Sequence, residues 1–209
     1  MRNFKLMSMA FLSLVLVITS CKKEEDVEPA DNNSTLKKGE VSLSRETEYG
    51  EDWVYYSFEN NAEVEVSDHL TSLDWDLAFN RYNVRTNGGE SGLGQAAVYD
   101  AGEIDFSSLA EAPEADYMQD DTIRIVKAFT GQGVEWMTST GNDVFKGCVD
   151  LEYGNQGPVF TTNNHIYVVK TAKGYYAKLW VKSFYSDEGE SGFINFKYHY
   201  QSAEGRELE

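Results

Sequence analysis

The stretch HIYVVKTAKGYYAKLWVKSFY, residues 165–185, decides the fold class of this chain. It predicts a strand over 165–170, a turn over 171–174 and a returning strand over 175–185. Successive side chains of a strand point to opposite faces of the sheet, so a half-buried strand alternates apolar and polar residues. The returning strand follows this rule: Ala177, Leu179 and Val181 fall on one face, and Lys178, Trp180 and Lys182 on the other.

Other segments have the same period or a strand-like composition. They are residues 53–58, 63–66, 123–129, 148–153 and 194–200. No window shows a helical period over three turns, and only residues 105–112 suggest one short helix. The aromatic content of 13% suits strand faces. We therefore expect an all-β chain that forms a single antiparallel, mostly meander or sandwich-like domain.

The N-terminus predicts a targeting segment that is not part of the fold. Arg2 and Lys5 form a basic start, residues 9–18 form an apolar run too short to span a bilayer, and Cys21 follows. Small residues directly before a cysteine resemble a bacterial lipobox, in which the chain is cut before Cys21 and the sulfur carries lipid. The alternative is an ordinary secretory cleavage next to a chance cysteine.

Three regions follow from this interpretation. Residues 1–20 are expected to be a lipoprotein signal peptide, 21–39 the lipidated Cys21 with a disordered acidic tether, and 40–209 the β domain. The domain is long enough for one sizeable core and too short for two comfortable ones.

The chain is strongly acidic and has one cysteine besides the anchor. Its formal net charge of −17 becomes −19 without residues 1–20, which hold Arg2 and Lys5 and no acid. Such a protein is repelled by nucleic acid, so we expect no nucleic-acid partner. Cys148 has no second thiol with which to form an internal disulfide, and we expect it to be a small core residue.

The sequence gives little support to catalysis. Its histidines are His69, His165 and His199, and no serine has the surroundings of an activated nucleophile. The glycines of residues 89–94 have the wrong spacing for a phosphate loop, and no amphipathic helix follows them. We expect a mobile or tightly turning loop there, and we expect that the protein is not an enzyme.

Asp74 and Asp76 would share one side of a strand, with Trp75 on the other side. Two carboxylates on one side are compatible with glycosidase-like chemistry or with calcium binding. The favoured interpretation is structural: Asp76 pairs with Arg81 or Arg85, or it caps a backbone turn.

Five pieces of the sequence, taken in order, resemble one known family. They are 53–58 (WVYYSF), 73–94 (LDWDLAFNRYNVRTNGGESGLG), 147–153 (GCVDLEY) followed by Gly157-Pro158, 167–178 (YVVKTAKGYYAK) and 194–200 (INFKYHY). The series resembles the HmuY family, haem-binding surface lipoproteins of the Bacteroidetes, over roughly residues 50–201.

The resemblance implies an all-β protein that captures haem outside the cell. The haem would be free or taken from haem-bearing host proteins, and it would pass to a TonB-dependent outer-membrane receptor. The charged residues 22–26 resemble the tag that sends such lipoproteins to the outer face of the outer membrane. The lipid on Cys21 would hold the protein there without a transmembrane helix.

The resemblance also suggests ligands for the iron. The best-known family member clamps haem iron between two histidines, at positions that correspond to about residues 131–137 and to Tyr153, and neither position is histidine here. Other family members use methionine pairs, so Met137, which follows Trp136, is the first axial candidate, and Tyr153 is the second. Met118 is a possible second sulfur donor but does not align with a ligand position. His165 begins a strand and matches a basic surface position of the family, so we expect it to be a surface histidine. Met137 and Tyr153 could instead be a core methionine and a cross-strand aromatic residue.

Two other functions remain open at this stage. A surface adhesin or glycan-binding module would stack sugar rings on Trp53, Trp136 or Trp180. A structural surface protein would bind no small ligand. Haem binding differs from both because it gives a visible absorption band.

Overall fold

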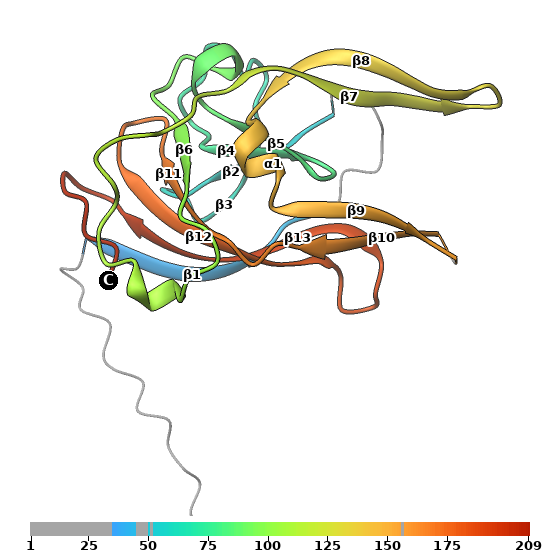
Figure 1. Ribbon diagram of the computed structural model, residues 1–209. Coiled ribbons are helices and arrows are strands. Elements are labelled where there is room, and N and C mark those ends of the chain that lie inside the picture. The colour runs from blue at the N-terminus through green and yellow to red at the C-terminus, as the bar shows by residue number, and fades with distance from the viewer. Residues whose placement is uncertain (1–34, 45–49, 51, 156) are drawn as a thin grey trace, which may run out of the picture. The chain divides into compact units, whose positions relative to one another are not determined.

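The computed structural model describes residues 35–44, 50, 52–155 and 157–209, and the prediction of an antiparallel all-β fold is confirmed (Figure 1). The described residues include one α-helix, α1 (Asp143–Lys146), and two 3-10 turns, η1 (Gly89–Ser91) and η2 (Phe106–Ser108). The helix expected over 105–112 is therefore only η2. The segments predicted to be a signal peptide (1–20) and, for the most part, a tether (21–39) lie outside the described residues. Among the residues described, no helix is long and apolar enough to cross a membrane.

Two antiparallel sheets form the body of the domain. The first has the order β1 (Leu36–Ser42), β13 (Ser191–Gln201), β12 (Tyr176–Tyr185), β11 (Ile166–Lys170), β6 (Ala97–Asp100). The second has the order β3 (Ala62–Val64), β2 (Val54–Ser57), β4 (Leu77–Asn80), β5 (Asn83–Thr86). β1 pairs with β13 from Leu36 onward, so residues 36–39 belong to the first sheet although the sequence placed the domain boundary at residue 40.

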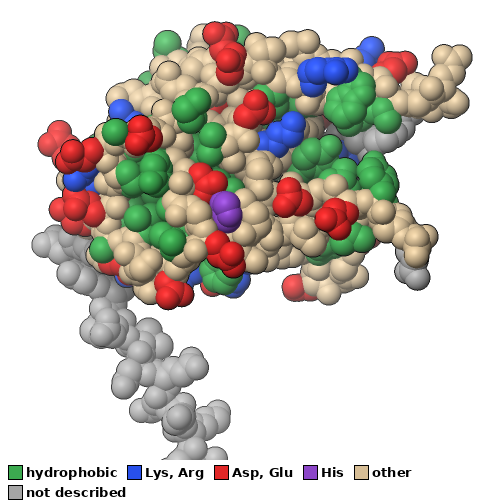
Figure 2. Space-filling model, viewed as in Figure 1, with side chains coloured by type: hydrophobic (Ala, Val, Ile, Leu, Met, Phe, Trp, Pro, Cys, Tyr) green, Lys and Arg blue, Asp and Glu red, His purple; other side chains and the backbone are tan. Residues whose placement is uncertain are grey.

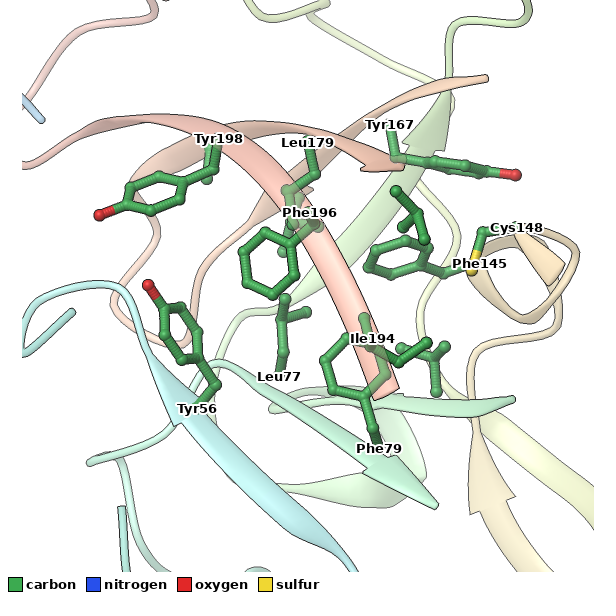
Figure 3. Close-up of a cluster of buried hydrophobic side chains, with 14 of the residues drawn as sticks. Tyr56, Leu77, Phe79, Phe145, Cys148, Tyr167, Leu179, Ile194, Phe196 and Tyr198 are labelled. Carbon is green, nitrogen blue, oxygen red and sulfur yellow. The ribbon is translucent and has the colours of Figure 1, made fainter. Parts of the chain in front are cut away.

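The core lies between these two sheets. Tyr56 and Leu77 of the second sheet meet Phe196 and Tyr198 of the first, as Figure 3 shows. The ring of Tyr56 packs edge-on against Phe196 with centroids 5.4 Å apart, a favoured aromatic geometry. The buried core also includes Cys148 and the apolar face predicted for β12, which consists of Ala177, Leu179 and Val181.

The glycine-rich loop turns tightly around one buried amide. The side chain of Asn87 donates to the carbonyls of Ser72 and Trp75, both at 2.9 Å, and its oxygen accepts from the amide of Gly94 at 3.1 Å. A Cβ at Gly92 would lie 2.2 Å from the Asn87 oxygen, so no side chain fits there. The strand that includes Asp74 and Asp76 in the sequence-based expectation begins only at Leu77. Residues 73–76 are not in a strand, and the Trp75 carbonyl accepts a hydrogen bond from Asn87 instead.

Two further hairpins extend from the body toward the same side (Figure 1). One consists of β7 (Asp121–Thr130) and β8 (Gly133–Gly141), and the other of β9 (Val149–Gly154) and β10 (Gly157–Thr162). Asp120 fixes the base of the first hairpin: its carboxylate accepts from the Thr86 amide at 2.7 Å and from the Asn142 side chain at 3.0 Å. The turn between β4 and β5 lies between the two hairpins.

Candidate functional site

A cavity of about 450 Å³ lies between the two extended hairpins. We call it the inter-hairpin cleft. The β7–β8 hairpin contributes Val126, Val134 and Trp136; the β9–β10 hairpin contributes Leu151, Tyr153, Pro158 and Phe160; and residues 80–83, Phe184 and Ser191 complete the lining. The cleft is thus mostly apolar and aromatic.

Strand alternation explains why these side chains face the cleft. On the first hairpin Val126 is the cross-strand partner of Trp136. On the second hairpin the cross-strand pairs are Leu151 with Phe160 and Tyr153 with Pro158. Cross-strand partners project from the same face of a hairpin, so each pair presents a continuous apolar surface. The two surfaces form opposite walls.

Large side chains in the cleft are much more exposed to solvent than core residues are. Tyr153 is 77% exposed and Trp136 is 48% exposed. Figure 2 shows hydrophobic side chains on both sides of the gap between the hairpins. Exposed apolar surface that faces itself across a gap is typical of a ligand site. The Arg124 guanidinium lies 5.3 Å from the Trp136 ring centroid, which adds positive charge at this wall.

The turn between β4 and β5 closes the inner end of the cleft. Arg81 adopts a left-handed backbone conformation (φ 55°), which makes the turn tight. The Asn80 side chain donates to the carbonyls of Gly50 and Asp52 at 2.9 and 2.7 Å, which anchors the turn. The ring of Tyr82 lies 6.1 Å from the Phe160 ring, so the turn and the second hairpin are in contact.

The structure brings two of the three predicted site residues together. Trp136 and Tyr153 line the cleft from opposite walls. Met137, next to Trp136 in β8, lies on the other face of the strand and packs against a buried cluster that includes Trp75 and Ile125. It does not line the cleft.

The remaining candidate ligands also lie elsewhere. Met118 is exposed and forms an isolated backbone bridge with Val98. His165 is paired with the Asp100 carboxylate through Nδ1 at 2.9 Å. Sequence reasoning missed Tyr82 and Phe160 as cleft residues. A tyrosine inside a tight turn is the only sequence signal that marks Tyr82, and nothing in sequence marks the position of Phe160.

The two residues of the acidic pair have different surroundings. Asp74 is exposed and bonded to Ser72, whereas Asp76 is buried and accepts from the amides of Phe58 at 2.9 Å and Ala172 at 3.1 Å. Burial raises the pKa of Asp76 to about 6. The expected partners Arg81 and Arg85 do not contact it, and the alternative of a backbone cap is the one observed. Among the described residues, no group of three or more histidine, cysteine or acidic side chains could hold a metal ion.

The family model described as HmuY protein matches residues 50–198. The chain belongs to the HmuY family. The match includes the β2–β4 region, both hairpins and the cleft between them, so the HmuY resemblance expected from the sequence is confirmed. No match was found among curated proteins.

Solved structures share the HmuY-type fold. An apo HmuY analogue of Tannerella forsythia is 21% identical, with a TM-score of 0.64, over 82% of this chain and 99% of that one. A candidate HmuY-like haem-binding protein of Bacteroides vulgatus is 24% identical, with a TM-score of 0.60, over 77% and 90%. A candidate lipoprotein of Bacteroides fragilis is 19% identical, with a TM-score of 0.61, over 80% and 90%. At these identities the likeness shows the fold.

Proposed function

We propose that this HmuY-family protein binds haem in the inter-hairpin cleft. The observation that carries the proposal is the pair of exposed apolar walls, with Trp136 on one and Tyr153 on the other. A flat macrocycle fits between two parallel apolar surfaces, and its burial there removes apolar area of both partners from water.

The cleft also has charge for the haem carboxylates. The chain as a whole is strongly acidic, yet Arg81 lines the cleft and Arg124 lies over Trp136. A guanidinium pairs with a carboxylate through parallel hydrogen bonds, so these two side chains are suited to haem propionates. Glu135 beside Trp136 is itself paired with Lys127 at 3.6 Å, which reduces its repulsion of the propionates.

We further propose sequestration and delivery as the role. The protein would be held at the outer membrane through lipid on Cys21, facing the extracellular side, and would pass haem to a TonB-dependent receptor. It would act as a carrier and not as an enzyme. What supports this is the family membership, the sequence before residue 40, and the open position of the cleft between two hairpins.

The glycan-binding alternative depends on three tryptophans, and the structure argues against one of them. Trp53 is only 8% exposed, and the Arg85 guanidinium lies 4.0 Å from its ring centroid, so one face of the ring is already covered and little of it is open to a sugar. Trp180 is partly buried, and Trp136 belongs to the cleft.

A haem titration of the full-length chain tests the proposal. We expect a shift of the Soret band that saturates at one equivalent. Trp136→Ala should weaken binding about tenfold, which corresponds to about 1.4 kcal/mol and is typical of one aromatic contact. Leu93→Ser is the matched control, because Leu93 is 68% exposed in the glycine-rich loop and does not line the cleft. Unsaturable binding, or equal losses in both variants, would reject the cleft as the haem site.

A further inference from the structure

The outer face of the five-stranded sheet is only partly covered. Val168, Lys178 and His199 are cross-strand neighbours on β11, β12 and β13, and all three are buried. Val168 and Leu208 belong to one buried cluster, and Leu109 packs against it, so the cover lies over this row. The next row of the same face, two residues along each strand, is covered less completely.

A cavity of about 700 Å³, which we call the outer-face cavity, lies over this second row. The row consists of Ile166, Trp180 and Lys197, which are cross-strand neighbours on the same three strands. Phe106 of η2 also lines the cavity, and the Lys197 ammonium lies 4.6 Å from its ring centroid. The volume falls in the range of about 300–1,000 Å³ that is typical of small-molecule sites. The outer-face cavity and the inter-hairpin cleft share none of their described lining residues.

Trp180 presents carbon to the outer-face cavity. The residue is partly buried, and its indole nitrogen is buried without a hydrogen-bond partner among the described residues. The exposed part of the side chain is therefore carbon. Buried indole N–H groups usually have a partner, so hydrogen bonding does not explain the orientation of this ring. What the orientation provides is an apolar platform in the cavity.

Polar side chains without partners surround this platform. Within the part of the chain that the structure describes, Glu103, Asp105, Asn164 and Lys197 form no side-chain hydrogen bond and no ion pair. Glu209 also lines the cavity, but its carboxylate already pairs with the Lys178 ammonium. The free groups are thus two carboxylates that accept hydrogen bonds, an ammonium that donates them, and an amide that does both.

We propose that the outer-face cavity binds a neutral saccharide, with one pyranose ring stacked on Trp180. A pyranose has an apolar face of C–H groups and a rim of hydroxyls that both donate and accept, which matches an apolar platform ringed by mixed donors and acceptors. Glu103 and Asp105 would accept from hydroxyls, and Lys197 would donate to them. Two free carboxylates against one ammonium repel a phosphorylated or sulfated sugar, so the ligand is neutral. This site is additional to the haem cleft and does not rest on the proposed haem function.

Calorimetric titration of the full-length chain tests the site. The probes are four neutral disaccharides (maltose, cellobiose, lactose and chitobiose) and a sulfated heparin disaccharide, each up to about 10 mM. We expect saturable binding of at least one neutral sugar, with a Kd of about 1 mM or below, and no binding of the sulfated one. Trp180→Ala should weaken binding about tenfold, and Lys197→Met, which leaves the platform in place, about threefold.

Trp136→Ala is the matched control, because it removes the same side chain from the other site. It should retain saccharide binding and weaken haem binding, whereas Trp180→Ala should do the reverse, and its retained haem binding shows that it is folded. The inference is overturned if no neutral sugar binds saturably, if the sulfated sugar binds as tightly, or if Trp136→Ala loses as much saccharide affinity as Trp180→Ala. Failure of the haem proposal looks different, because the wild type would then bind a disaccharide and no haem.

Discussion

Asp76 links the two sheets through two hydrogen bonds. Its two carboxylate oxygens accept from the amide of Phe58, which follows β2, and from that of Ala172, in the turn between β11 and β12. These contacts satisfy two buried donors but place a carboxylate in a low-dielectric site. Burial is the largest cause of the raised pKa of Asp76, and the two amide bonds oppose it.

This raised pKa makes stability depend on pH. The folded-state pKa of about 6 lies above the ordinary aspartate pKa of 3.8, so the folded protein holds this proton more strongly than the unfolded chain. The contribution is fully present below pH 3.8 and is lost as pH rises through 6, by about 3 kcal/mol in all. Asp76→Asn cannot ionise, so the stability difference between wild type and variant should shrink by that amount between pH 3.5 and 7, measured by urea unfolding.

Two other buried groups also have shifted pKa values, which is why the difference between wild type and variant is measured. Burial raises the pKa of Asp120 and lowers that of His199. Both remain in the Asp76→Asn variant, so their effects cancel in the subtraction. A difference that stays constant over the pH range would show that folding does not change the pKa of Asp76.

The hydrogen-bond partners of Asp76 could not be predicted from the sequence. Its amide donors are 18 and 96 residues away along the chain. The nearby arginines offered a simpler partner, and a backbone cap could be stated only as an alternative. The buried state of Cys148 was easier to predict, because an apolar strand-like run surrounds it.

One face of β8 lines the cleft, and the other face packs on the core. Trp136 faces the cleft and is half-exposed, whereas Met137 packs on the buried cluster below. We expect Met137→Ala to lower the free energy of unfolding by about 2 kcal/mol, the lower end for a buried methionine, with porphyrin binding retained. Trp136→Ala should cost less than about 1 kcal/mol of stability and should weaken porphyrin binding instead. Chemical unfolding and porphyrin titration of both variants check this pair, and the opposite assignment of effects would mean that β8 has the other register.

One strand of each cleft hairpin was predicted from the sequence, but the cleft between the hairpins was not. Strand-like composition predicted strands close to β7 and β9, and period-two alternation predicted those close to β12 and β13, because each pattern depends only on neighbouring residues. The cleft depends on how two hairpins diverge from the body and on the β4–β5 turn between them. The family resemblance suggested positions near Trp136 and Tyr153, yet strand parity alone, once the register was known, separated Trp136 from Met137.

The loop over residues 87–95 depends on Asn87 more than on its glycines alone. Three hydrogen bonds from this buried amide hold the 72–75 segment and Gly94 together. Asn87→Ala should lower the free energy of unfolding by about 3 kcal/mol, since each lost bond contributes about 1 kcal/mol. Asn60→Ala is the control, because Asn60 is exposed and its change should have almost no effect. A small effect of Asn87→Ala in thermal or urea unfolding would mean that water replaces its bonds.

Distant parts of the chain meet on the outer face of the five-stranded sheet. The C-terminal residues cover this face: the Leu208 amide donates to the Ala110 carbonyl at 2.8 Å, and the Leu208 side chain is fully buried. Lys178 of β12 binds the segments that cover this face. Its ammonium donates to the carbonyls of Phe106 and Leu109 at 2.7 and 2.9 Å and pairs with Glu209. Lys178 was predicted on the polar face of β12. It is completely buried because Phe106, Leu109 and Glu209 cover it.

Glu209 is the counter-charge for this arrangement. Besides Lys178, it lies 3.8 Å from the Lys38 ammonium and 3.7 Å from His199. Glu209→Gln would leave the buried Lys178 charge without a carboxylate, and we expect a loss of about 2 kcal/mol, below the range for fully buried pairs because Glu209 is partly exposed. Glu207→Gln, two residues away, should be neutral.

A double-mutant cycle separates the ion pair from the rest of the cover. Lys178→Met removes the buried charge, so Glu209→Gln should cost much less in that background than in the wild type. Urea unfolding of the four proteins measures this coupling. Equal costs in both backgrounds would mean that Glu209 acts through Lys38 and His199. Since β12 and β13 carry both this cover and the inner core, a coupled result would also place the C-terminal residues within the same cooperative unit as the sheet.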